Sequence, residues 1–308
     1  MQINRDLSDV STITVTFNPD LALLKSQLAV LPPESFKLII DNASDSKIRE
    51  QIKSLVGQTH NARLVWNAEN IGLAAALNLG VSLLREHDPN LRFVLLLDQD
   101  SEPQPGSIHT LVKAFETLTE RGLRVGCVGP TLVDATTNLE HGFHQATRWR
   151  WRRVYPRQGM TDAVPCANLN GSGTLVPIDL FQSLGGLDEA FFIDHVDTAW
   201  SFRVLAAGYG LFGIPNAVFK HRMGQASVRF WLLGWRIWPA RAPRRHYFLF
   251  RNAIFLIRRS EVLVVWKSWA VAKLLLVAGI HGMFDTERVE QWRQMWRGVR
   301  DGLRKPER

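Results

Sequence analysis

The 308 residues of this chain are 46% hydrophobic and 21% charged, which is enough apolar material for one large globular domain or two modest ones. The two cysteines, Cys127 and Cys166, exclude a disulfide framework and a cysteine-ligated metal site, and the N-terminal segment lacks the basic and apolar regions of a secretory signal. The net charge of +8 is unevenly spread, and a reducing cytoplasm is the expected location.

Residues 12–130 alternate short β-rich runs with helical patterns. Strands are predicted at 12–17, 37–41, 62–66, 92–98 and 124–130, and helices at about 19–31, 46–56, 70–86 and 105–122. Runs such as LIID and VLLL are continuous rather than alternating, as expected for parallel strands buried on both faces. The sequence therefore predicts an α/β fold with a mostly parallel sheet and flanking helices.

The second half of the chain is less regular. We expect a basic loop at about 140–160, the segment NGSGTLVP at 170–177, a helix ending at Ser183, a helix at 195–207, strands at 209–215 and 218–224, and a mainly helical tail broken near Pro239 and Pro243. No internal repeat is visible in the sequence.

Polar side chains follow four consecutive predicted strands. They are Asn18, then Asp41, Asn42 and Ser44, then Asn67 and Asn70, then Asp98, Gln99 and Asp100. Ligands of open α/β sheets bind at the carboxyl ends of the strands. One crevice lined by these side chains is suited to a base, a ribose and a diphosphate.

The pair Asp98 and Asp100 comes directly after a buried strand. Mg²⁺ and Mn²⁺ prefer oxygen ligands, and Mg²⁺ is usually held by one or two carboxylates together with substrate phosphates. The alternative is that these aspartates serve only a turn, because Asp and Ser favour turns and helix caps.

Arginine and tryptophan gather in the second half of the chain, in RWRWRR at 148–153 and again across 229–259. An anionic membrane surface, a lipid-linked acceptor, a solvated face and nucleic acid all fit this pattern. We favour the membrane surface or lipid-linked acceptor and do not expect nucleic acid. The apolar stretch 261–280 is interrupted by Lys267 and Lys273, which cost roughly 2.5–3.5 kcal/mol each at the centre of a spanning helix. We therefore expect a helix that lies in the membrane interface or packs on the protein.

Several motifs, and the order in which they occur, resemble those of the family 2 inverting glycosyltransferases. Within that family the resemblance is to the bacterial rhamnosyltransferases. The motifs are TFNP, IIDNASD, NAENIGLAAALNLG, LLLDQDSEP, NGSGTLVP, FFIDHVDTAWSFR, KHRMG and HYFLFRNAIFLIRR, between residues 11 and 258. The resemblance implies a GT-A fold, with a nucleotide-sugar-binding half at 1–130 and an acceptor-binding half at 131–224. Residues 225–308 would form a basic, Trp-rich helical region.

The resemblance also implies roles for individual residues. Asp41 matches the aspartate that accepts a hydrogen bond from the pyrimidine ring; its alternative role is a helix N-cap. Asp98 matches the residue at the ribose or at a metal-bound water, and Asp100 matches the direct ligand of Mg²⁺ or Mn²⁺. Gln99 replaces the acidic or variable middle residue of many relatives, although DQD is frequent in the rhamnosyltransferase branch.

Inversion at the sugar requires a base that deprotonates the acceptor hydroxyl. Asp197 in FFIDHVDTAWSFR aligns with the family base, although Val196 stands where relatives often have Glu. Asp194 is the rival, on nearly the same helical face if the helix has begun there. We favour Asp197, because helix capping explains Asp194 better.

Other residues are expected around the donor. His221 matches a histidine that joins the metal or contacts the diphosphate, and Arg222 and Arg251 are candidates to clamp that diphosphate. Gly171 and Ser172 match a loop beneath the sugar, where glycine lets the backbone approach a ligand. Asn18 and Asn70 complete the predicted nucleotide-sugar site.

The sequence thus predicts a metal-dependent inverting glycosyltransferase that moves a sugar, with dTDP-L-rhamnose as the expected donor, to a cell-envelope glycan or glycolipid acceptor. We expect it to be peripheral on the cytoplasmic face of the inner membrane. A sugar-1-phosphate nucleotidyltransferase is one alternative, but it would need a Gly-rich basic loop after the first strand. A non-catalytic membrane or nucleic-acid binding protein is another, and it gives the paired aspartates no role.

Overall fold

The computed structural model describes residues 6–157, 159–221, 227–231, 235–239 and 241–304. The chain divides into two compact units. The first unit contains Met1–Gln145, Arg153–Phe192 and Val196–Arg222, and the second contains Ala146–Arg152, Ile193–His195 and Met223–Arg308. The domain boundaries expected at residues 130 and 224 stay predictions.

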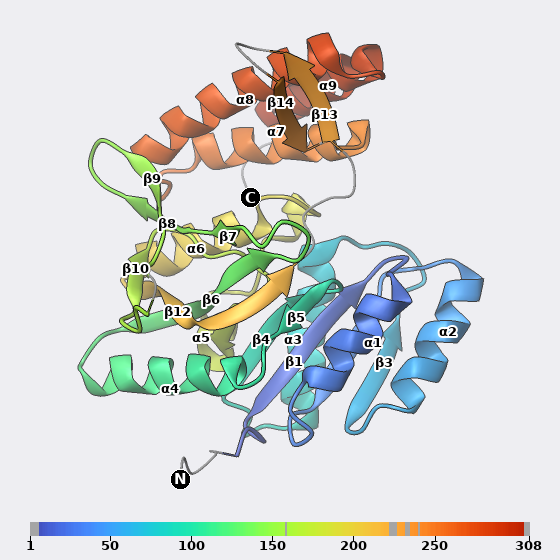
Figure 1. The fold of residues 1–308 in the computed structure, drawn as a ribbon, viewed down its shortest axis with the longest axis vertical. Helices are drawn as coiled ribbons and strands as arrows, with labels where there is room; N and C mark the ends of the chain where they lie inside the picture. The colour runs from blue at the N-terminus through green and yellow to red at the C-terminus, as the bar shows by residue number, and fades with distance from the viewer. Residues whose placement is uncertain (1–5, 158, 222–226, 232–234, 240, 305–308) are drawn as a thin grey trace. The chain divides into compact units, whose positions relative to one another are not determined.

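A ten-stranded sheet forms the centre of the first unit (Figure 1). Its strands lie in the order β10 (Val164–Cys166), β12 (Gly210–His221), β6 (Val125–Asp134), β11 (Leu175–Pro177), β4 (Phe93–Asp98), β1 (Val10–Thr16), β2 (Lys37–Asp41) and β3 (Ala62–Trp66), while β5 (Ser101–Pro103) pairs with β12 and β7 (Glu140–His141) with β6. The four strands β4, β1, β2 and β3 are parallel, and so are β6 and β12. The predicted α/β fold with a largely parallel sheet is confirmed.

Helices cover both faces of this sheet. On one face, α1 (Leu21–Val30), α2 (Ser46–Gly57) and α4 (Ser107–Glu120) pack into a core with the inward side chains of the strands (Figure 1). On the other face lie α3 (Leu73–His87), α5 (Ile178–Ser183) and α6 (Val196–Ala206), with the short helix η1 (Glu189–Phe191) before α6. The central strands β2 and β4 therefore bury both of their faces, which explains their continuous apolar runs.

Three details between residues 140 and 221 differ from the sequence predictions. The expected strand at 209–215 and the described part of the one at 218–224 form one strand, β12, whose pairing with β6 shifts register between Ile214 and Val218; residues 222–224 lie outside the described residues. A proline at position 215 cannot donate to the ladder, so it reads as a break although the strand continues through a bulge. The expected loop at 140–160 contains β7, β8 (Phe143–Ala146) and β9 (Trp151–Val154), which are too short and too polar to show an apolar alternation. β11 inserts antiparallel between β4 and β6.

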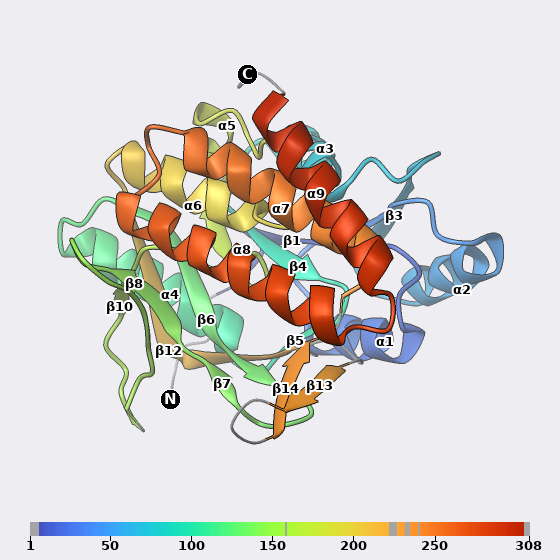
Figure 2. The same cartoon turned by 90° about the horizontal axis from the view of Figure 1, so that it is seen from above.

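The second unit is mainly helical, as predicted, with α7 (Pro243–Arg258), α8 (Val264–Phe284) and α9 (Arg288–Arg304) side by side (Figure 2). An antiparallel hairpin of β13 (Ser227–Trp231) and β14 (Trp235–Pro239) precedes them, where only helix was expected. Gly298 and Gly302 let α9 approach α7 closely, since a Cβ at Gly298 would lie 2.5 Å from the carbonyl oxygen of Tyr247. By length and composition alone, α8 could cross a membrane.

A buried polar network joins the three helices of the second unit. The amide nitrogen of Gln291 donates to the carbonyl oxygen of Arg241 at 2.9 Å and to Asp285 at 3.1 Å. The amide oxygen of Gln291 therefore faces Nδ1 of His246, 2.5 Å away, so this nitrogen carries the proton. Burial lowers the pKa of His246 to about 4, which keeps the ring neutral in the folded chain.

We expect the second unit to lose stability as the pH falls from about 6.5 to about 4. An unfolded histidine titrates near 6.5, whereas burial lowers the pKa of both His246 and His195 to about 4. Within this window the unfolded chain binds protons that the folded chain does not, so the free energy of unfolding decreases with decreasing pH. Urea unfolding followed by tryptophan fluorescence at pH 7.5 and 4.5 measures the effect. H246Q should reduce the difference, and H60Q, at an exposed histidine of the first unit, should not.

Candidate active site

The end of β4 and the end of β12 meet through the short strand β5. After Asp98 the chain turns at Gln99 and Asp100, and β5 then runs antiparallel to the end of β12. In this pairing Ser101 lies opposite His221, which is why a histidine so distant in sequence reaches the aspartates. The register of two short strands thus assembles the group.

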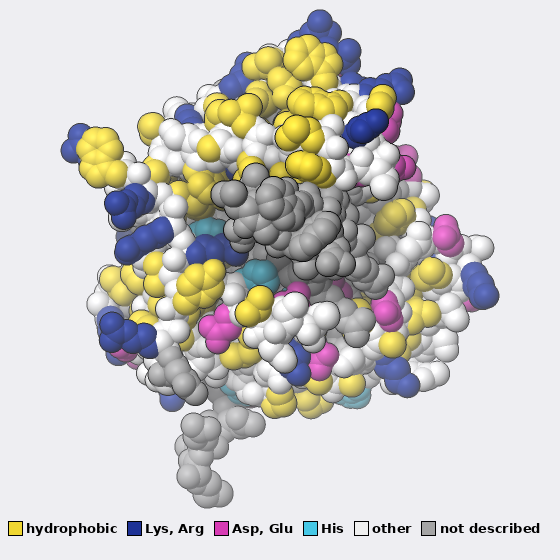
Figure 3. Space-filling model, turned by 45° about the horizontal axis from the view of Figure 1, so that its top comes forward, with side chains coloured by type: hydrophobic (Ala, Val, Ile, Leu, Met, Phe, Trp, Pro, Cys, Tyr) yellow, Lys and Arg dark blue, Asp and Glu magenta, His cyan; other side chains and the backbone are white. Residues whose placement is uncertain are grey.

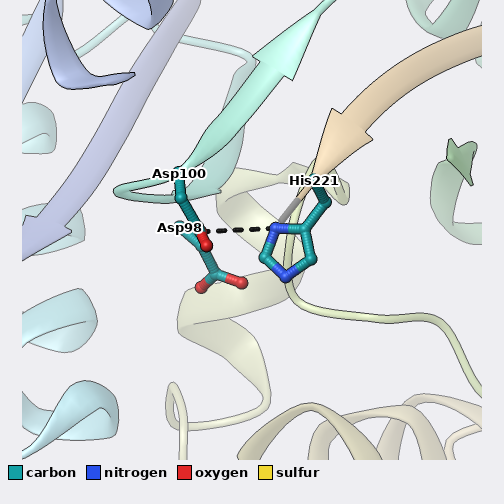
Figure 4. A group of neighbouring side chains, drawn as sticks. All are labelled: Asp98, Asp100 and His221. Carbon is teal, nitrogen blue, oxygen red and sulfur yellow. Dashed lines mark ion pairs between the residues drawn. The ribbon is translucent and has the colours of Figure 1, made fainter. Parts of the chain in front are cut away.

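Asp98, Asp100 and His221 form a cluster with the composition of a metal site (Figure 4). One ligand atom from each residue lies within 4.8 Å of the others, and Nδ1 of His221 is 3.3 Å from Oδ1 of Asp100. This Nδ1 is buried and has no hydrogen-bond partner among the described residues. Two carboxylates and an imidazole fit Mn²⁺, and carboxylates with phosphate oxygens fit Mg²⁺. The unsatisfied nitrogen indicates that these residues suit a bound cation.

A buried glutamine in α1 fixes the backbone of the aspartate turn. The side-chain nitrogen of Gln27 donates to the carbonyl oxygens of Asp98 at 2.7 Å and Ser101 at 2.6 Å, while its oxygen accepts from Thr14 at 2.8 Å. Gln27 is fully buried. A single glutamine in a helix gives no signal of burial, so Gln27 was not predicted from the sequence. Gln99 adds a second tie, since its side-chain oxygen accepts from the backbone N–H of Phe17 at 2.8 Å.

Asp41 lies at the end of β2 and is fully buried. Its carboxylate accepts hydrogen bonds from the hydroxyls of Thr16 at 3.1 Å and Ser44 at 2.5 Å and from the N–H of Ser44 at 2.9 Å. Nε of Arg49 lies 3.4 Å from the same carboxylate. These bonds orient the side chain of Asp41 and occupy much of its acceptor capacity. Its contact with a pyrimidine ring stays a prediction.

The asparagines at the strand ends hydrogen-bond the loops that follow β1, β2 and β3 to one another. Asn18 adopts a positive φ of 46°; its N–H donates to Ser44 and its side-chain oxygen accepts from the N–H of Asp45. Asn42 donates to Asn70 at 3.0 Å and accepts from Asn67 at 3.1 Å. These polar residues, expected at one edge of the sheet, are therefore next to one another in a hydrogen-bonded network.

The loop Asn170–Gly173 lies between β4 and α6. The hydroxyl of Ser172 contacts that of Ser101, and Ser172 is fully buried. Gly171 faces Asp197: its N–H donates to Oδ2 of Asp197 at 3.4 Å. Asp197 stands in the first turn of α6, half-buried, and also accepts from the N–H of Thr198 at 2.7 Å. Ser172 thus supports the aspartate turn, and Gly171 positions Asp197.

Asp194 belongs to the second unit and is held by two arginines. Its carboxylate accepts two bonds of 2.9 Å from Arg245 and one of 3.0 Å from Arg241. Burial alone would raise the pKa of Asp194, but Arg245 and then Arg241 outweigh it, so this pKa is lowered. A carboxylate bound in this way is a weak base.

The backbone at Asp194 is also unusual. Asp194 and His195 have φ angles of 62° and 63°, in the left-handed region that non-glycine residues rarely adopt. The side-chain amide of Asn252 donates to the carbonyl oxygens of Ile193 at 2.7 Å and Asp194 at 2.8 Å, and so holds this conformation. Asn252 lies in the motif HYFLFRNAIFLIRR, but no role was predicted for it from the sequence.

The two arginines predicted at the diphosphate have different outcomes. Arg251 is buried in α7 of the second unit, where its Nε donates to Asn252 at 2.9 Å and its guanidinium lies 5.0 Å from the ring centroid of Phe248. Its contribution to the donor site stays a prediction. Arg222 lies outside the described residues.

We expect the cluster of Asp98, Asp100 and His221 to bind Mn²⁺. The substitution D100N should weaken this binding at least about tenfold, since even residues that only support a metal ligand cost 10–100-fold. H221N should weaken Mn²⁺ more than Mg²⁺, because imidazole suits the softer ion. The measurement is free Mn²⁺ by electron paramagnetic resonance, with and without pyrophosphate. The exposed Asp162 supplies the control D162N, and equal binding by D100N and wild type would contradict the assignment.

Known proteins share sequence with almost the entire chain. The chain is 24% identical over 299 residues to the dTDP-rhamnosyl transferase RfbF of Shigella flexneri, covering 96% of both proteins. It is 25% identical over 249 residues to an N-acetylglucosaminyl-diphospho-decaprenol L-rhamnosyltransferase of Mycobacterium tuberculosis, covering 73% of this chain and 78% of that protein.

Solved structures share the fold. The crystal structure of GalNAc-T7 with UDP, GalNAc and Mn²⁺ matches 92% of this chain with a TM-score of 0.60 and 16% identity, and the chain spans 53% of that protein. The mannosyltransferase PcManGT of Pyrobaculum calidifontis, in complex with GDP-Man and Mn²⁺, matches 97% of this chain and 88% of its own with a TM-score of 0.53 and 16% identity. The family model for glycosyl transferase family 2 matches residues 21–183, more than half of the sequence. The chain therefore belongs to glycosyl transferase family 2.

Proposed function

We propose that this protein transfers a sugar from a nucleotide-sugar donor to a hydroxyl of a cell-envelope glycan, with inversion at the anomeric carbon. The observation that carries the proposal is the cluster of Asp98, Asp100 and His221 at the carboxyl ends of β4 and β12, beside strand-end loops suited to a nucleotide. A divalent cation held there would offset the charge that develops on the departing diphosphate.

The proposed donor is dTDP-L-rhamnose. Support comes from the two relatives, which are named as a dTDP-rhamnosyl transferase and an L-rhamnosyltransferase. The second acts on a sugar linked through a diphosphate to decaprenol, by its name. A lipid-linked oligosaccharide or a lipopolysaccharide is therefore the acceptor class that we propose, with the reaction on the cytoplasmic face of the inner membrane.

Asp197 is our candidate for the base. In the proposed reaction the acceptor oxygen bonds to the anomeric carbon as the bond from that carbon to the diphosphate breaks. The hydroxyl proton moves to the carboxylate, and the nucleoside diphosphate leaves with the bonding electrons. Asp197 is half-buried in the first turn of α6, where its carboxylate accepts from the N–H groups of Gly171 and Thr198. Asp194, by contrast, is ion-paired with Arg241 and Arg245, and these pairs give it a role in holding the second unit together.

The substitution D197N should reduce sugar transfer about 10²–10⁴-fold, the usual contribution of a general base. The affinity for dTDP should stay within about twofold of the wild-type value. Asp197 is distant in sequence from Asp98 and Asp100, and its hydrogen-bond donors Gly171 and Thr198 lie outside the metal cluster. Transfer is measured with radiolabelled dTDP-L-rhamnose and an N-acetylglucosaminyl-diphospho-polyprenol acceptor, and dTDP binding by calorimetry.

The matched substitution D194N separates the two aspartates. It should lower the unfolding temperature, because Arg241 and Arg245 lose their shared partner, while folded D194N should retain transfer at low temperature. If D197N stays active and folded D194N is inactive, Asp194 is the base and our assignment is wrong.

A donor screen by thermal shift tests the nucleotide and the sugar. With Mn²⁺ present, dTDP-L-rhamnose should raise the unfolding temperature more than UDP- or GDP-sugars do, and D100N should abolish the difference. The stabilisation follows from binding to the folded state alone. A larger shift with a GDP-sugar would refute the proposed donor while leaving sugar transfer itself open to assay.

A further inference from the structure

The exposed face of α8 carries no charged side chain. Every position of this helix that is exposed to solvent is uncharged, and the large apolar ones among them are Val264, Val271, Leu275, Leu276, Met283 and Phe284. Leu275 is 70% exposed. The opposite face of the helix is packed in the second unit through residues such as Trp266, Leu274 and Val277. A large exposed apolar face of this kind marks an interaction surface.

The two lysines of α8 lie off this face. Nζ of Lys267 donates to the carbonyl oxygen of Arg259 at 2.6 Å, and Nζ of Lys273 lies 4.8 Å from the ring centroid of Trp269. Both lysines are only partly exposed. In the sequence they interrupt the apolar stretch, but in the structure they leave the exposed side of the helix without a charge. Because the other side packs on protein, α8 is better suited to lie along a bilayer surface than to cross it.

Helix α9 continues the apolar surface and adds a basic edge. At 100° per residue, Val289, Trp292, Trp296 and Leu303 fall on one exposed stripe. Arg293, Arg297, Arg300 and Arg304 fall on the adjoining exposed stripe. The helix packs on the protein through a third face that contains Gln291, Met295, Gly298 and Gly302. Apolar and aromatic residues beside a row of arginines are typical of helices that lie at an anionic membrane interface.

The two apolar surfaces are continuous at the turn between the helices. Nε1 of Trp292 donates to the carbonyl oxygen of Gly282 at 3.3 Å, and a Cβ at Gly282 would lie only 2.2 Å from that nitrogen. The indole of Trp292 therefore lies directly on the end of α8. Figure 3 shows hydrophobic side chains gathered at the top of the view, with Lys and Arg side chains at their edges.

We propose that the exposed face of α8 and α9 is a membrane-docking face that lies flat on an anionic bilayer, with Leu275 and Trp296 inserted at the level of the lipid headgroups. The row of arginines on α9 favours a membrane over a protein partner. An apolar protein surface has no use for these positive charges, whereas the phosphate headgroups of anionic lipids attract them. The inference deepens the proposed function, which places the acceptor at the same membrane surface, but the docking itself does not depend on sugar transfer.

The test is sedimentation of the full chain with vesicles in the absence of nucleotide. Vesicles of about 30% phosphatidylglycerol in phosphatidylcholine should bind the wild type, and vesicles of pure phosphatidylcholine should bind it much less. R293Q/R297Q should weaken binding to the anionic vesicles about 30-fold, from the loss of two basic groups near an anionic surface. The control R63Q/R121Q removes the same charge from exposed sites in the first unit and should change binding less than about threefold.

A second pair of variants tests the apolar part of the face. L275S/W296S should lose binding at all salt concentrations, and L123S/L139S, at exposed leucines of the first unit, should retain it. Absence of vesicle binding by the wild type at low salt overturns the proposal, and so does equal binding by L275S/W296S. A wild type that is dimeric in ultracentrifugation, does not bind vesicles and becomes monomeric in L275S/W296S would assign the face to a second copy of the chain.

The failure of this inference is distinguishable from the failure of the proposed function. Stabilisation by dTDP-L-rhamnose is measured without lipid and should be the same in wild type, R293Q/R297Q and L275S/W296S. Vesicle binding without any donor binding refutes the proposed function alone, and donor binding without vesicle binding refutes the docking face alone.

Discussion

The antiparallel pairing of β5 with the end of β12 is the constraint on which the candidate active site depends. It places Ser101 opposite His221 and so brings the histidine beside Asp98 and Asp100. Three residues of ladder achieve this, and a slip of one residue would turn the imidazole to the other face of the sheet. The long strand β12 resists such a slip because it also pairs with β6 along its length, with a bulge that absorbs the proline at position 215. The metal cluster is therefore a property of the sheet and is built by elements that the rest of the first unit stabilises.

Four of the five aspartates singled out by the sequence differ clearly in their environments. Asp98 and Asp100 lie together with a histidine whose ring nitrogen lacks a partner among the described residues, which suits a cation. Asp194 is neutralised by two guanidinium groups in a strained segment, and its bonds explain its burial without any catalytic role. Asp197 lies at the start of α6 and accepts from the N–H of Gly171. One residue type thus serves structure and, in our proposals, metal binding and proton transfer, and the neighbours of each carboxylate set the difference.

The sequence predicted the family, the α/β class, the strands β1 to β4 and the residues at their ends, because buried parallel strands give continuous apolar runs and ligand sites lie at strand ends. It could not show that β11 inserts antiparallel between β4 and β6, since the strand contains only three residues. The strands between 140 and 154, of two to four residues each, were missed because they are short, and β13 and β14, of five residues each, lie in a tail that was expected to be helical. Gln27 and Asn252 were missed because their roles lie in bonds to distant backbone carbonyls, which no local pattern encodes. The basic and apolar stripes of α9 were visible only as composition until helix packing separated them into faces.

Gln27 has a consequence for the thermodynamics of the metal cluster. Its one side chain joins three elements, since it bonds to Thr14 of β1 and to backbone oxygens on both sides of the aspartate turn. Docking of helix α1 and cation binding at the aspartate turn are therefore linked, because Gln27 of the docked helix holds the backbone that sets the spacing of the two carboxylates. A cation that binds the turn must in return favour the docked helix by the same free energy. The affinity of the site for its ion is thus partly a measure of how firmly α1 is attached, although no residue of that helix belongs to the cluster itself.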